Sequence, residues 1–119
     1  MPYEPTTDTV DYVEIAVPDV QISRRFFEQL FSWKFTDYGP DYTAFDDGRL
    51  NGGFRTRDTG IQNATNDVLV VFYTRDLEAM VQKVEQLGGT ICKPIFSFPG
   101  GRRFHFRGPD QIEYALWSE

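Results

Sequence analysis

The sequence predicts an α+β fold built from two βαβββ modules whose strands form a cupped mixed β-sheet. Residues 11–33 combine an alternating strand, an aspartate and an amphipathic helix, and a similar unit begins about 57 residues later, when Asp19 is aligned with Asp76. Three further strand patterns follow each unit, and one polar stretch separates the two halves. A repeated unit in a chain of 119 residues indicates a fold made of two halves.

The first module opens with a strand over residues 9–17, in which apolar and polar side chains alternate. We expect the face that carries Val13 to pack on a helix and the face that carries Tyr12 and Glu14 to be open. Asp19 is the predicted N-cap of a helix over 19–31. The apolar side chains of this helix recur with the spacing of one stripe: Ile22, Phe26, Phe27 and Leu30.

Three short strands should complete the first module: residues 33–38, 42–46 and 50–56. Asp47-Gly48 is a strong hairpin signal between the last two. Gly52-Gly53 inside a strand indicates a bulge or a close approach of backbone to another group.

The second module repeats this order after a polar linker at residues 58–66. The expected elements are a strand at 68–73, a helix at 77–87, a strand at 90–94, a loop containing Pro99-Gly100-Gly101, and strands at 102–107 and 112–117. Residues 1–119 are thus predicted to form a single domain, with modules at 9–57 and 67–118. The open faces of both modules are expected to line one concave surface.

Composition excludes several classes of function. A net charge of −6 and a pI near 4.7 argue against binding to nucleic acid or to anionic membranes. The chain has no run of 18 apolar residues, and its start lacks the pattern of a signal peptide. The single Cys92 cannot form an intramolecular disulfide. We therefore expect a cytoplasmic protein.

Four stretches, in this order and spacing, resemble the vicinal oxygen chelate superfamily: EIAVPDVQISRRFFEQLFSW, LNGGF, DLEAMVQKVEQLGG and GRRFHFRGPDQIEYALW. This superfamily includes glyoxalase I, extradiol dioxygenases, and the fosfomycin-resistance and bleomycin-resistance proteins. The resemblance covers nearly the whole chain. It implies a glyoxalase/bleomycin-resistance-like domain that forms a homodimer.

The resemblance also implies where a metal ion would bind. The first, third and fourth ligand positions fall at Tyr12, Leu69 and Ala115, and the second lies within residues 50–54, where no His, Asp or Glu occurs. Leucine and alanine offer no donor atoms, and a lone tyrosine hydroxyl is a poor ligand for divalent ions. We therefore expect no metal and no other cofactor, which argues against glyoxalase I or extradiol dioxygenase chemistry.

Three residues are candidates for catalysis: Tyr12, Glu14 and His105. Tyr12 could donate a hydrogen bond or act as a general acid, or simply fill the space of a metal. Glu14, with Glu113, could bind a cationic ligand or act as a base, or form an ion pair with an arginine such as Arg49 or Arg103. His105 is the only histidine and is otherwise structural or at the rim.

The predicted ligand-binding set lies on the expected open faces: Tyr12, Glu14, Phe45, Asn51, Leu69, Glu113, Ala115 and Trp117. Its aromatic members could instead belong to the core. Arg102 and Arg103 follow a Gly-Gly loop and could bind an anion or lie on the surface.

The favoured function is metal-independent binding of a small molecule, cationic or aromatic, with antibiotic sequestration as one form of it. The alternative is a lyase or isomerase of the same superfamily acting on a small oxygenated substrate. A third reading is a catalytically inactive domain kept for association.

Overall fold

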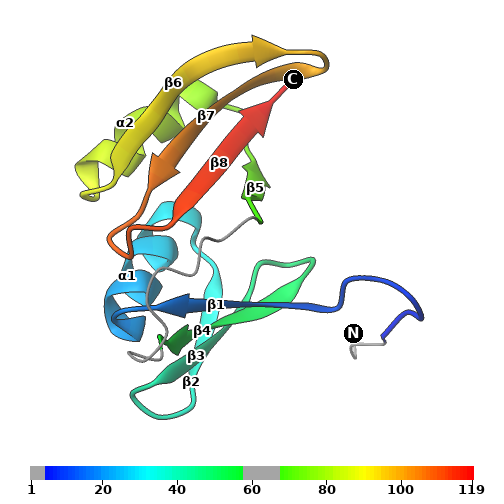
Figure 1. Cartoon of the computed structure of the whole chain (residues 1–119), viewed down its shortest axis with the longest axis vertical. Helices are drawn as coiled ribbons and strands as arrows, with labels where there is room; N and C mark the ends of the chain where they lie inside the picture. Colours follow the sequence, from blue (N-terminus) through cyan, green and yellow to red (C-terminus); the bar gives the residue numbers. More distant parts are fainter. Residues whose placement is uncertain (1–4, 58–67) are drawn as a thin grey trace. The chain divides into compact units, whose positions relative to one another are not determined.

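The computed structural model describes residues 5–57 and 68–119. They belong to two compact units, one within residues 1–58 and one within 59–119. Each unit has one helix and one four-stranded mixed sheet (Figure 1). The predicted α+β fold of two βαβββ modules is confirmed.

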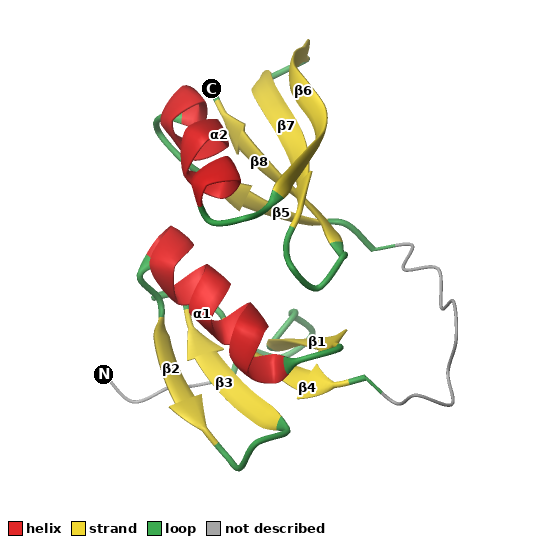
Figure 2. Ribbon diagram, turned by 90° about the vertical axis from the view of Figure 1, so that its left-hand side faces the viewer, coloured by secondary structure: helices red, strands yellow, loops and turns green. Residues whose placement is uncertain are grey.

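The N-terminal unit contains β1 (Tyr12–Val17), α1 (Val20–Phe31), β2 (Lys34–Asp37), β3 (Tyr42–Asp46) and β4 (Asn51–Thr56). Its sheet has the order β1-β4-β3-β2, with β1 parallel to β4 and the other pairs antiparallel. Helix α1 lies across one face of this sheet (Figure 2). The opposite face is not covered by a helix of the same unit.

The core of the N-terminal unit is aromatic. Phe27 of α1 is fully buried and stacks on Phe54 of β4 and on Trp33, at centroid distances of 5.3 and 5.6 Å. Asp19 caps α1 as expected, because its side chain accepts hydrogen bonds from the backbone N–H groups of Gln21 and Ile22.

The C-terminal unit contains β5 (Val70–Tyr73), α2 (Leu77–Gln86), β6 (Thr90–Phe98), β7 (Gly101–Arg107) and β8 (Glu113–Ser118). The strand order is β5-β8-β7-β6, with β5 parallel to β8. Helix α2 begins at its N-cap Asp76 and packs on one face of the sheet, as Figure 2 shows. The two units therefore repeat one topology.

Strand β6 differs from the prediction, because it runs to Phe98 instead of ending near Pro94. Proline is tolerated here for two reasons. β6 is an edge strand of its sheet, and the pairing register shifts between Lys93 and Phe96, on either side of the proline. The predicted linker at 58–66 lies outside the described residues.

Alternation assigns the remaining side chains to the open faces. Val17, Phe104, Phe106, Tyr114 and Leu116 are fully buried. Their neighbours in sequence point the other way. That the two open faces line one surface stays a prediction.

No helix in residues 5–57 and 68–119 is long and apolar enough to span a bilayer.

Candidate functional site

A chain of polar contacts crosses the open face of the N-terminal sheet. The hydroxyl groups of Tyr12 on β1 and Tyr42 on β3 hydrogen-bond to each other. The Tyr42 hydroxyl also donates to Glu14 Oε2 at 3.0 Å, and Glu14 Oε1 lies 3.0 Å from Arg55 Nε on β4. Glu14 is therefore paired with Arg55 and not with Arg49 or Arg103.

The direction of these hydrogen bonds follows from proton counting. The Glu14 carboxylate can only accept, so the single hydroxyl proton of Tyr42 goes to Glu14. Tyr42 must then accept from Tyr12. Burial and the hydrogen bond that Tyr42 donates to Glu14 raise the pKa of Tyr42 above its usual value. This network holds the Tyr42 phenol neutral and leaves lone pairs of the half-exposed Tyr12 oxygen available to a ligand donor.

Gly53 of β4 provides the space for this network. A Cβ at Gly53 would overlap the Tyr42 hydroxyl and come within 2.7 Å of the Tyr12 hydroxyl. The close approach predicted for Gly52-Gly53 is therefore present. Gly52 faces the other way, where a Cβ would overlap the ring of Phe45.

The open face of the C-terminal sheet carries a histidine–carboxylate pair. His105 Nδ1 on β7 lies 2.6 Å from Glu113 Oε2 on β8. His105 is only 5% exposed, whereas Glu113 is exposed. Because a carboxylate accepts, the contact favours the proton on Nδ1 and leaves Nε2 as an acceptor. Nε2 is buried and has no hydrogen-bond partner among the described residues.

A shallow hollow of about 320 Å³ lies on the same unit, next to the hairpin of β6 and β7. Its lining is largely apolar, with one cationic side chain: Val71, Phe98, Gly100, Arg103 and Trp117. The Arg103 guanidinium lies over the rings of Phe96 and Phe98, 5.4 and 5.5 Å from their centroids. Trp117 lies in edge contact with Phe98. Aromatic walls with a planar cation suit a flat ligand.

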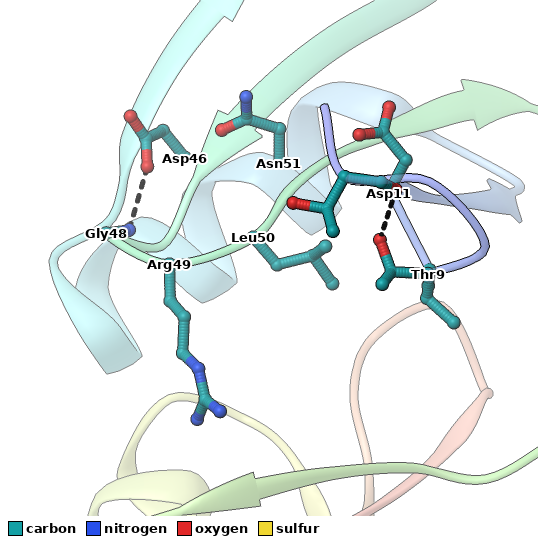
Figure 3. A pocket seen from close by; sticks show the side chains of 9 residues that line it. Thr9, Asp11, Asp46, Gly48, Arg49, Leu50 and Asn51 are labelled. Atoms are coloured by element: carbon teal, nitrogen blue, oxygen red, sulfur yellow. Dashed lines mark hydrogen bonds between the residues drawn. The ribbon is translucent and has the colours of Figure 1, made fainter. Parts of the chain in front are cut away.

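The N-terminal unit has a second, polar pocket of about 330 Å³, shown in Figure 3. It lies between the segment that precedes β1 and the β3–β4 turn, and Asn51 lines it together with Asp11 and Asp46. Asp46 already accepts a hydrogen bond from the Gly48 backbone N–H, as Figure 3 marks. Asn51 therefore lies beside the β3–β4 turn, at the position of β4 that pairs with Tyr12.

The predicted site residues thus fall into separate groups. Tyr12 joins Glu14 through Tyr42, His105 joins Glu113, and Trp117 lines the hollow. Leu69 is 36% exposed and lies just before β5, and Ala115 is fully buried on β8.

Phe45 requires a correction, because it does not lie on the open face. It is only 6% exposed and stacks on Trp33 at 4.7 Å in the core. The reason is alternation on β3, where Tyr42 and Ala44 face outward and Phe45 faces α1.

The residues at the metal-ligand positions of the superfamily do not fit a divalent ion. Leu69 and Ala115 have no donor atoms, and the Tyr12 hydroxyl is engaged by Tyr42. Across residues 5–57 and 68–119, no three His, Cys, Asp or Glu side chains are grouped so that they could hold a metal ion.

Sequence reasoning missed Tyr42 and Arg55. A signal for both was present, since Tyr42 occupies the outward phase of its strand and pairs directly with Arg55 in the β3–β4 register. What the sequence could not supply was the strand order β1-β4-β3, which brings these two residues to Glu14.

The fold and the open sheet faces define a protein of paired βαβββ modules. The family model of the Glyoxalase/Bleomycin resistance protein/Dioxygenase superfamily matches residues 9–116. The chain belongs to this superfamily. A comparison with curated proteins gave no match.

Solved structures show the same fold at low sequence identity. The fosfomycin resistance protein FosX from Mesorhizobium loti is 16% identical, with a TM-score of 0.76 over 96% of this chain and 94% of that chain. A mutant FosX from Listeria monocytogenes, in complex with Mn(II) and 1S,2S-dihydroxypropylphosphonic acid, is 15% identical, with a TM-score of 0.78 over 94% and 90%. TioX from Micromonospora sp. ML1 is 16% identical, with a TM-score of 0.69 over 92% and 97%.

Proposed function

We propose that this protein is a metal-independent binder of small aromatic molecules. The observation that carries the proposal is the hollow formed by Val71, Phe98, Arg103 and Trp117. Its volume is at the lower end of the range for small-molecule sites, about 300–1,000 Å³. The residues at the metal-ligand positions, Leu69 above all, support binding without a metal.

Antibiotic sequestration is the biological form of this function that we propose. The superfamily description includes a bleomycin resistance protein, and a structural neighbour is a fosfomycin resistance protein. The site supports the aromatic part of the expected ligand more than the cationic part. Glu14 and Glu113, the carboxylates expected to hold a cation, are already paired with Arg55 and His105.

The test combines metal analysis with ligand titration. Purified protein should contain no stoichiometric divalent ion, and titration calorimetry with naphthylmethanol should give saturable binding that EDTA leaves unchanged. Trp117→Ala should weaken this binding, because it removes a wall of the hollow. Tyr38→Ala is the matched control, since Tyr38 is an aromatic residue that is 66% exposed and outside the hollow. One divalent ion per chain, required for binding, would refute the proposal.

A lyase or isomerase is the second candidate, and the His105–Glu113 pair favours it. A buried imidazole held through Nδ1 by a carboxylate, with an Nε2 that has no hydrogen-bond partner among the described residues, is a suitable general base for removing a proton next to a carbonyl group. With hydroxyacetone in D2O, proton NMR should then show exchange at the carbon-bound hydrogens. His105→Gln should abolish the exchange, and Arg102→Gln should not. If the wild-type protein does not catalyse this hydrogen–deuterium exchange, the lyase or isomerase function is wrong for this substrate class, and small-molecule binding stays the proposed function.

We also propose that the protein is a cytoplasmic homodimer. Three side chains of the C-terminal unit present apolar surface on or next to its open face: Leu69, Val71 and Tyr73, which are 36, 42 and 48% exposed. Covering them with a second chain would be favourable. Sedimentation equilibrium should give twice the mass of 13.8 kDa, and Val71→Lys should shift it towards the monomer. A monomeric wild type at micromolar concentration would refute the dimer.

A further inference from the structure

We infer that the hollow beside β6 and β7 is selective for planar aromatic anions, with Arg103 as the residue that binds the carboxylate. This inference rests on the proposed binding function and specifies the chemical class of its ligand. It depends on the charge balance around Arg103 and on the geometry of the rings beside it.

Arg103 differs from the arginines that the structure pairs with carboxylates. Arg24, Arg55 and Arg102 each lie within 4 Å of a carboxylate oxygen, at distances of 2.5 to 3.6 Å. Arg103 makes no such contact with any described residue, and its buried Nε has no acceptor there. Its positive charge is therefore not neutralised within the part of the chain that the structure describes.

The surroundings add to this positive charge. The Nζ of Lys93 lies 5.3 Å from the Phe96 ring centroid, on the same ring that Arg103 covers. Glu113 and Glu119 have other contacts, with His105 and with the Tyr73 hydroxyl, and neither carboxylate lies within 4 Å of a guanidinium nitrogen of Arg103. An incoming anion would therefore meet unneutralised positive charge, although the chain as a whole is acidic.

The geometry of the side chains around the hollow favours a flat anion. The guanidinium is planar and its donors match the two oxygens of a carboxylate. The aromatic rings of Phe98 and Trp117 border the hollow, and Val71 adds apolar surface. A volume of about 320 Å³ is enough for one or two fused rings. An aromatic carboxylate can contact the aromatic rings and pair with the Arg103 guanidinium at the same time. An ammonium group at the same point would be repelled by the positive charge of Arg103.

The test uses three probes that share one ring system and differ in their head group: naphthoate, naphthylmethanol and naphthylmethylammonium. Titration calorimetry of the full chain should show naphthoate binding about tenfold or more tightly than the other two, as expected for a hydrogen bond between charged groups. Its affinity should also fall as salt is added, because part of the attraction is Coulombic.

Two variants test whether Arg103 is the residue that causes the preference for naphthoate. Arg103→Gln should abolish the preference for naphthoate, so that naphthoate and naphthylmethanol bind the variant with similar affinity. A far-UV circular dichroism spectrum like that of the wild type shows that the variant is folded. Arg102→Gln is the matched control: it changes the same charge at the adjacent position, but Arg102 is paired with Glu78. This variant should bind naphthoate like the wild type.

The outcomes separate this inference from the proposed function. If naphthylmethanol or naphthylmethylammonium binds as tightly as naphthoate, or if Arg103→Gln keeps the preference, the anion selectivity is wrong and small-molecule binding stands. If none of the three probes binds, both proposals fail.

Discussion

Gly53 packs against the phenol of Tyr42 so closely that a Cβ on the glycine would overlap the tyrosine hydroxyl. The absence of a side chain at this position of β4 allows the hydroxyl to lie between Tyr12 and Glu14. The glycine is therefore a spatial requirement of the polar network, and its backbone φ is not the reason for it, since Gly53 is not among the positive-φ residues.

Gly53→Ala should lower the free energy of unfolding by about 1–3 kcal/mol, because the new methyl group must displace the Tyr42 ring and break its hydrogen bond to Glu14. Urea denaturation measures the loss. The control is the same substitution in a Tyr42→Ala background, where the ring is gone and the penalty should largely disappear. An equal loss in both backgrounds would mean that Tyr42 is not the group displaced.

Tyr42 should also make stability depend on alkaline pH. Its pKa in the folded protein is raised above the ordinary value of 10 by burial and by the hydrogen bond that it donates to Glu14. The folded state therefore holds its proton more tightly than the unfolded state, so the stabilisation is complete below pH 10 and is lost as the pH rises above it. Urea denaturation from about pH 8 to about pH 11 should show a smaller decline for Tyr42→Phe than for the wild type. If the free energy of unfolding falls equally with pH in the wild type and in Tyr42→Phe, Tyr42 is not the group responsible. Tyr73 and Tyr114, whose pKa values are also raised, account for the decline that persists.

Much of the fold could be predicted because its signals are local. The N-caps Asp19 and Asp76 precede apolar residues at helical spacing, and alternation on the first strand correctly assigned Tyr12 and Glu14 to the exposed side. The end of β6 could not be predicted in this way. Proline normally ends a strand, and Pro94 is tolerated because β6 is an edge strand and because its pairing register shifts at this point.

The polar pairs were harder to predict because they depend on strand order and register. Glu14 and Arg55 are brought together by the parallel pairing of β1 with β4, which no local pattern encodes. The prediction for Phe45 was wrong for a related reason. The residue type alone does not tell whether an aromatic side chain of a strand lies on the core face or on the open face of the sheet. The phase of its own strand, in which Tyr42 faces outward, would have assigned it to the core.

Ser32→Gly should stabilise the N-terminal unit. Ser32 ends α1 in the left-handed region, with φ 60° and ψ 34°, where a Cβ is unfavourable by about 1–2 kcal/mol. Glycine removes this penalty. It also raises the conformational entropy of the unfolded chain, which lowers the free energy of unfolding by about 0.4–1 kcal/mol. We expect a net gain of about 0.5 kcal/mol in urea denaturation. Ser32→Ala is the control, because it changes the side chain but keeps the Cβ, and it should give no gain. Equal effects of the two substitutions would exclude backbone strain as the cause.

The His105–Glu113 contact should be measurable as a coupling energy. Glu113→Ala leaves Nδ1 of a histidine that is only 5% exposed without an acceptor, which should cost about 1–3 kcal/mol in free energy of unfolding. In a His105→Leu background the donor is gone, and the same substitution should cost little, so the cycle gives a coupling of about 1–2 kcal/mol. Glu85→Ala is the matched control, since it removes an exposed glutamate of α2 that has no ion pair with a described residue. If Glu113→Ala is as mild as Glu85→Ala in the wild-type background, the carboxylate does not orient the imidazole, and the case for His105 as a base is lost.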